Sequence, residues 1–139
     1  MESSARHLAF HAALVLLIGL LCGALYGRAV NRNAAAHIVH SWRVAHASLP
    51  MAAMLMFAIA AVLSAFIVPA RVKWLISIAL ISSSYTFCIS LPLAAVVGHR
   101  GLSMQGPPVA KLVFMGNMLG AWLSLAAAAV IIYAGYVSL

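Results

Sequence analysis

The chain has 139 residues, of which 66% are hydrophobic and only 6% are charged. A soluble domain carries about a quarter charged residues, so this composition excludes a soluble globular protein and indicates an integral membrane protein. Glu2 is the only acid against eight lysines and arginines, which excludes reactions that need a pair of carboxylates. The basic residues stand singly in short loops, so we expect them to meet lipid head groups and expect no nucleic-acid partner.

Four apolar stretches are each long enough to cross a bilayer as a helix. We expect the spans at about residues 8–26, 45–68, 74–97 and 109–137. The first stretch is long for the apolar part of a signal peptide, and Gly27-Arg28 follows it where small residues would mark a cleavage site, so we expect it to be retained. The sequence therefore predicts one all-α domain over residues 1–139, an integral membrane four-helix bundle.

The first span carries Gly19, Gly23 and Gly27 on one helical face. Glycines at this spacing let another helix approach closely, although membrane helices also simply tolerate glycine. The fourth span repeats the pattern at Gly116 and Gly120, with Asn117 between them, which favours an oligomer. His11 lies one turn inside the first span, where an ionisable ring needs a partner helix or a ligand.

The loop before the second span, residues 27–43, is the most polar part of the chain. His37 and His40 are three residues apart and could share a metal on a helix, but no acid or cysteine lies near them in the sequence, so this signal is weak and plain interfacial histidines are the favoured interpretation. Cys22 and Cys88 both lie within apolar stretches, where we expect packed free thiols.

His46, where this loop enters the membrane, is the main candidate for a metal ligand. A neutral imidazole binds iron well, and the alternative is a histidine that merely meets water at the helix mouth. Five apolar residues follow it on the same helical face: Leu49, Pro50, Ala53, Met54 and Phe57. A flat, acid-free face suits a porphyrin, so we expect Met54 and Phe57 at the cofactor. The helix either runs through Pro50 or begins near Ser48.

Three further side chains are candidates for the same site. Arg43 lies one turn before His46, and its guanidinium could pair with a haem propionate. Met54 could be an axial ligand, although packing is the commoner role of methionine. Tyr85 lies in the polar middle of the third span, residues 82–86, where its hydroxyl needs a buried partner and could donate to a bound ligand.

Residues 42–50, WRVAHASLP, place a Trp, then Ala-His, then a Pro at the start of the second span. This pattern resembles the styrene oxide isomerase family of small four-helix membrane enzymes. The third loop is similar to that family's Arg-Gly-Leu and Gly-Pro stretch at residues 100–102 and 106–107, and His11 falls where the family has a histidine. The resemblance covers nearly the whole chain.

The resemblance implies a homotrimer that binds haem b between its subunits, with His46 as axial ligand of the iron. It also implies that ferric haem, as a Lewis acid, isomerises a small hydrophobic substrate such as an aryl epoxide to an aldehyde, without net redox change. The family has an Asn, an Asp and a Tyr where this chain has Ala52, Ser83 and Leu91. We expect the protein in the bacterial inner membrane.

Two other functions fit the same residues. One is a non-catalytic haem protein that senses a gas or carries electrons, and the other is a membrane partner subunit without a cofactor. A second strong ligand such as His11 or Met54 would favour electron transfer. An open position on the iron, with Tyr85 nearby, would favour isomerisation.

Overall fold

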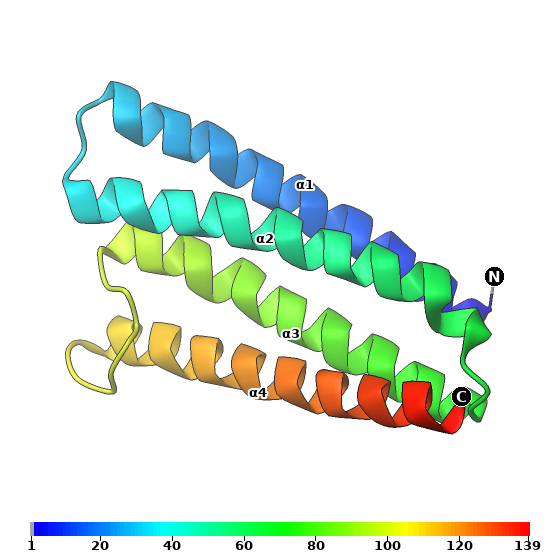
Figure 1. Ribbon diagram of the computed structural model, residues 1–139. Coiled ribbons are helices and arrows are strands. Elements are labelled where there is room, and N and C mark those ends of the chain that lie inside the picture. The colour runs from blue at the N-terminus through cyan, green and yellow to red at the C-terminus, as the bar shows by residue number, and fades with distance from the viewer. Residues whose placement is uncertain (1) are drawn as a thin grey trace.

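The computed structural model describes residues 2–139 (Figure 1). This part of the chain is helical with short loops: α1 (Ser3–Asn31), α2 (Ala36–Val62), the 3₁₀ turn η1 (Leu63–Ala65), α3 (Ala70–Val97) and α4 (Pro108–Val137). Four helices are long and apolar enough to cross a membrane. The prediction of an all-α integral membrane protein with four spans is confirmed.

The helices are longer than the predicted spans, most clearly at the start of α2. That helix begins at Ala36 and continues through Pro50, so the predicted loop at residues 27–43 shortens to 32–35. Long basic side chains can reach water from a helix end, which allows polar residues to continue the helix beyond the apolar span. His46 therefore lies ten residues inside a helix and not at its mouth.

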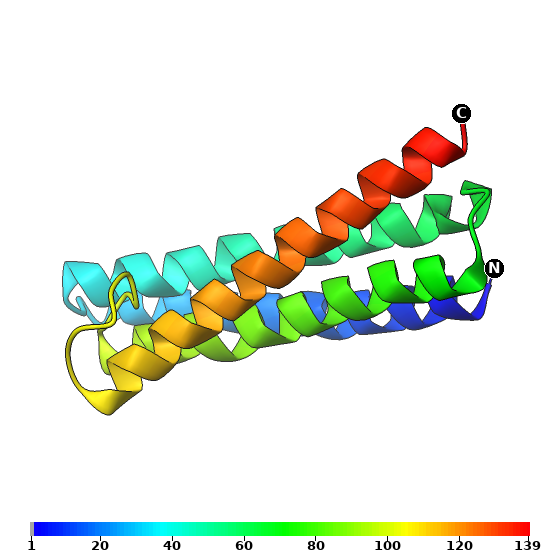
Figure 2. The same cartoon turned by 90° about the horizontal axis from the view of Figure 1, so that it is seen from below.

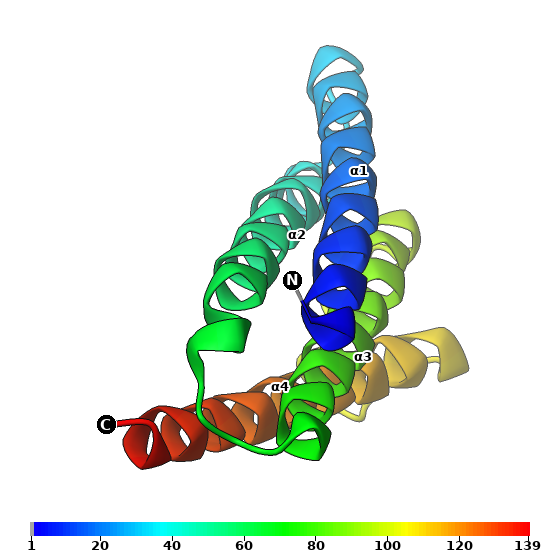
Figure 3. The same cartoon turned by 90° about the vertical axis from the view of Figure 1, so that its right-hand side faces the viewer.

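The chain forms two helical hairpins, α1 with α2 and α3 with α4, which meet where α3 packs on α1 and α2. In Figures 2 and 3, α4 crosses α3 obliquely, and its C-terminal end lies on the side of α2. Alanines make up much of the core, together with a few larger side chains such as Leu8, Leu49 and Ile76. Small side chains at helix contacts let backbones approach closely, as is usual in membrane proteins.

The glycines of α1 allow its close contact with α2. A Cβ atom at Gly19 would lie 2.5 Å from Cδ of Pro50, and one at Gly23 would lie 2.6 Å from Cε1 of His46. Nothing lies within 4 Å of a Cβ placed at Gly27. The predicted glycine face is therefore real at its first two positions, and its partner is the next helix of the same chain.

The glycines of α4 face α3 in the same way. A Cβ atom at Gly116 would lie 2.9 Å from Cβ of Ser90, and one at Gly120 would lie 2.8 Å from the ring of Phe87. The Asn117 side chain also bonds within the chain, where its oxygen accepts a 2.8 Å hydrogen bond from the Ser90 hydroxyl. These contacts account for the motif that favoured an oligomer, so oligomerisation stays a prediction.

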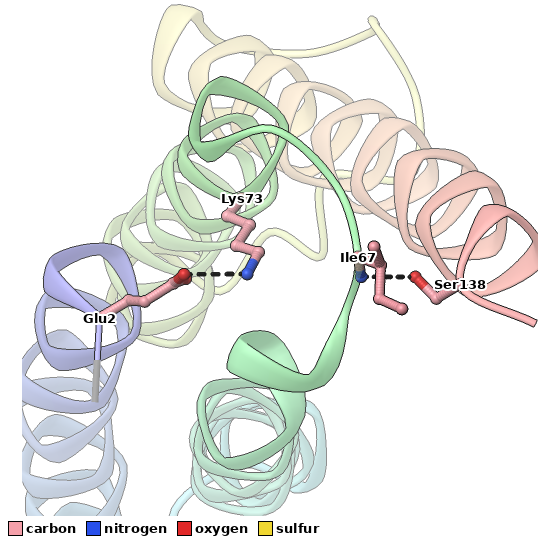
Figure 4. A network of polar contacts seen from close by, with 4 residues as sticks. All are labelled: Glu2, Ile67, Lys73 and Ser138. Carbon is pink, nitrogen blue, oxygen red and sulfur yellow. Dashed lines mark hydrogen bonds and ion pairs between the residues drawn. The ribbon is translucent and has the colours of Figure 1, made fainter.

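At the end of the molecule that holds the N-terminus, two polar contacts join different segments of the chain (Figure 4). The ammonium of Lys73, nearly buried, lies 2.9 Å from the carboxylate of Glu2, and the Ile67 backbone N–H donates to the Ser138 hydroxyl at 2.8 Å. The single acid of the chain is thus engaged at this end. The α1–α2 and α3–α4 loops lie at the other end (Figure 1).

Candidate functional site

His46 is held by a hydrogen bond from its ring to the backbone of α1. Its Nδ1 lies 3.0 Å from the carbonyl oxygen of Gly19. Because a carbonyl can only accept, Nδ1 carries the hydrogen and Nε2 keeps its lone pair. This is the arrangement usual for histidines that bind metals, where a bond from the second nitrogen fixes the tautomer and the orientation of the ring.

Two more residues of α1 surround the half-buried ring. Gly23 leaves the space that the ring occupies, since a Cβ there would lie 2.7 Å from Nδ1 of His46. The ring of Tyr26 stacks on the imidazole, with the centroids 6.4 Å apart and the planes inclined by 19°. The sequence singled out His46 but not this support, because the residues that provide it are on another helix.

The predicted flat face after His46 is divided by the packing. Leu49 and Ala53 are fully buried, whereas Met54 is 62% exposed and Phe57 is half-buried. The prediction that all five residues form one face open to a porphyrin was therefore wrong, because the packing buries Leu49 and Ala53. Met54 and Phe57 remain accessible on α2, and their contact with a cofactor stays a prediction.

Arg43 lies at the exposed surface and contacts a histidine other than His46. Its Nη2 lies 2.8 Å from Nδ1 of His40, and Nη2 of Arg100 lies 2.8 Å from Nε2 of the same ring. Arg100 comes from the loop between α3 and α4 and was not among the predicted site residues. In the sequence, Arg100 was noted only as part of the Arg-Gly-Leu stretch of the resemblance, which gave it no role in the site.

Tyr85 lies apart from His46. Its hydroxyl lies 2.8 Å from Nδ1 of His11, and the two rings meet edge to face. Along α1, His11 precedes Gly19, the contact of His46, by eight residues, or about 12 Å. Within one chain, the position expected for Tyr85 beside the iron ligand is therefore not found, and the partner that His11 needed is a side chain of a neighbouring helix.

An apolar cavity of about 240 Å³ lies between α2 and α3. It is lined by Ser48, Leu49, Ala52, Phe87 and Leu91. Two of the three positions at which the resemblance placed polar groups, Ala52 and Leu91, thus meet at one cavity. The third does not, because Ser83 is buried and donates to the carbonyl of Gly120 at 2.8 Å.

The remaining candidate residues make structural contacts or lack the further ligands that a metal site needs. No group of three or more histidines, cysteines or acids among residues 2–139 is placed to hold a metal ion. His40 lies between two guanidinium groups and not against a second histidine. Cys22 and Cys88 are free thiols, as predicted. Thr86 bonds the carbonyl of Ser82 in its own helix, which is the ordinary role of a hydroxyl inside a span.

Comparison with known proteins gives one result. The model of the styrene oxide isomerase family matches residues 4–136, which include nearly all of the four helices. No curated protein and no solved structure matches the chain.

Proposed function

Because the chain belongs to the styrene oxide isomerase family, we propose that it is a haem-b enzyme of the membrane that isomerises a small hydrophobic epoxide, such as an aryl epoxide, to an aldehyde. In this proposal, His46 is the axial ligand of the iron. The observation that carries it is the hydrogen bond from Nδ1 of His46 to the Gly19 carbonyl, which leaves Nε2 free to bind a metal.

The residues around His46 fit this role. A single protein ligand is enough for haem iron, so the lack of a larger ligand cluster in the described residues is compatible with it. The ring is oriented by Gly19 and by the stacked Tyr26. In this proposal, Arg43 pairs with a propionate, while Met54 and Phe57 offer apolar contact to the porphyrin.

When bound, ferric haem supplies a Lewis acid for the epoxide oxygen. The hydride shift is internal to the substrate, so the reaction needs neither a redox partner nor a net proton. The contribution of this chain is to hold the substrate and exclude water, which would otherwise open the epoxide to a diol. The cavity between α2 and α3 suits this task, because Ser48 is its only polar lining residue.

The same proposal assigns the oligomer and the location. Three copies of the chain bind haem b at their contacts, in the bacterial inner membrane. The outer faces of the helices are apolar, with side chains such as Leu21, Leu55 and Leu125 more than half exposed. Such faces can contact lipid or a second copy. Within one chain, Tyr85 bonds His11 and lies apart from His46, so we assign it no contact with the haem of its own subunit.

The alternative function, electron transfer, would need a second strong protein ligand that occupies the open coordination position of the iron. Within the chain, His11 already bonds Tyr85. We therefore favour an open position on the iron.

The test is the absorption spectrum of the purified protein, followed by incubation with styrene oxide. The proposal predicts a Soret band that shifts when imidazole is added, and formation of phenylacetaldehyde. A Soret band without aldehyde would leave a haem protein of the gas-sensing or electron-transfer kind. A protein that takes up no haem would support the cofactor-free partner subunit.

A further inference from the structure

The ring of His40 lies between the side chains of two arginines, which come from different parts of the chain. The Nη2 atoms of Arg43 and Arg100 lie 2.8 Å from the two different ring nitrogens of His40. A guanidinium group only donates, and a neutral imidazole has one acceptor nitrogen and one N–H. One of the two contacts therefore sets a donor against a donor.

Among residues 2–139, no carboxylate is paired with either of these guanidinium groups. The only acid, Glu2, is engaged by Lys73 at the opposite end of the molecule (Figures 1 and 4). Two always-charged groups on one ring repel each other, although solvent weakens the repulsion because both side chains are exposed. An anion with two acceptor oxygens would satisfy both guanidinium groups at once.

A cavity open to the surface lies at this point. It has a volume of about 620 Å³ and is lined by Tyr26, Ala36, His37, Val39, His40, Arg43 and Arg100. Tyr26 also stacks on the ring of His46, so the cavity lies beside the proposed iron ligand. Two of the loops between the spans lie at this end of the bundle (Figure 1), so we expect the cavity near the lipid head groups, where phosphate is available.

We propose that Arg43 and Arg100 form a receptor for one oxyanion, with His40 between them and accepting a hydrogen bond from one of the two guanidinium groups. The oxyanion is either a porphyrin carboxylate or the phosphate of an anionic lipid. The porphyrin source rests on the proposed function, whereas the receptor itself does not. Arg100 thus makes residues 98–107, the loop between α3 and α4, part of a binding site.

The first experiment separates the carboxylate from the rest of the porphyrin. Wild type, Arg100→Gln, Arg100→Lys and the control Arg71→Gln are titrated with haem b and with its dimethyl ester, which has no carboxylate, and binding is measured by the Soret band. Arg71 is an exposed arginine at the start of α3 and does not line this cavity. Its variant removes the same charge as Arg100→Gln and so controls for the loss of charge alone.

For a carboxylate ligand, Arg100→Gln should weaken haem b binding roughly tenfold, as expected for loss of a charge-assisted hydrogen bond. The dimethyl ester should bind wild type and this variant equally, and Arg71→Gln should change neither affinity. Arg100→Lys should recover only part of the loss, because it restores the charge without the planar fork. Equal weakening of both porphyrins, without dependence on lipid, would mean a structural role and would overturn the receptor.

The second experiment addresses the lipid. Thermal unfolding of wild type and Arg100→Gln is compared in nanodiscs of phosphatidylcholine and of phosphatidylglycerol. A lipid ligand predicts that phosphatidylglycerol stabilises wild type and that Arg100→Gln removes this gain. If wild type binds no haem, the proposed function fails, and this comparison still decides on the receptor. No effect of Arg100→Gln in either experiment would refute it.

Discussion

Gly23 gives the sharpest test of the support around His46. A methyl group at this position would lie 2.6 Å from Cε1 and 2.7 Å from Nδ1 of the imidazole, far inside the van der Waals contact distance. In Gly23→Ala, the ring must turn or α1 must move away from α2. Either movement strains or breaks the 3.0 Å bond from His46 to the Gly19 carbonyl.

The magnitude follows from three effects. Overpacking a close contact costs about 1–3 kcal/mol, and loss of the hydrogen bond costs about 1 kcal/mol more. The better helix propensity of alanine returns at most about 1 kcal/mol. We expect Gly23→Ala to lower the free energy of unfolding by about 1–3 kcal/mol and, because the ring is displaced, to weaken haem binding by about tenfold or more.

Gly27→Ala is the matched control. It makes the same change one turn further along the same face, where nothing lies within 4 Å of the added atom. It should leave haem binding unchanged and the stability equal or slightly higher. Denaturant titration followed by circular dichroism measures the stability, and Soret titration measures the binding. If Gly23→Ala and Gly27→Ala behave alike in both assays, the inference that Gly23 makes room for the ring of His46 is wrong.

Three other changes test the rest of the site and fold. Arg43→Ala should weaken haem retention and Arg43→Lys should restore only part of it; full retention in the alanine variant would assign this residue to lipid head groups. Glu2→Gln should lower the free energy of unfolding by about 1 kcal/mol, because it removes the negative charge that neutralises the nearly buried ammonium of Lys73, and an unchanged melting temperature would contradict this. Gly120→Ala should push the ring of Phe87, 2.8 Å from the added atom, into the α2–α3 cavity, so turnover of stilbene oxide should fall more than that of styrene oxide; equal effects on both would remove Phe87 from the substrate site.

The spans could be predicted because hydropathy alone determines them, and all four are present. Their ends could not, since helix formation continues past the apolar region at both ends of α1 and at the start of α2. This difference moved His46 from the mouth of a helix into its interior. The residue was identified correctly as a candidate from its chemistry, while its surroundings depended on the helix length.

Partners across helices were the part that sequence could not supply. The glycines of α1 indicated a close contact, but not that the groups entering it are Pro50 and His46. Tyr85 was expected near the iron ligand because a buried hydroxyl needs a partner, and it has one in His11. The register in which two helices pack decides which of their faces are in contact. Residues 82–86 are polar on every side of the helix, so the sequence did not indicate which side of α3 faces α1.

The site at Arg100 was missed for a related reason. The Arg-Gly-Leu stretch at residues 100–102 supported the resemblance, but an arginine in a glycine-rich loop does not by itself distinguish a ligand site from contact with lipid. Its significance comes only from the fold, which brings it to the ring of His40, sixty residues earlier in the chain and already in contact with Arg43.

The most direct test of the proposed function is the Soret band of His46→Ala compared with wild type. The account predicts that wild type binds haem b, that its spectrum responds to added imidazole, and that His46→Ala loses stable haem binding. Imidazole supplied in solution should restore part of the binding, because the alanine variant leaves empty the space beside Gly23 that the ring of His46 occupies. A His46→Ala protein that keeps the full Soret band would contradict the assignment of His46 as the iron ligand.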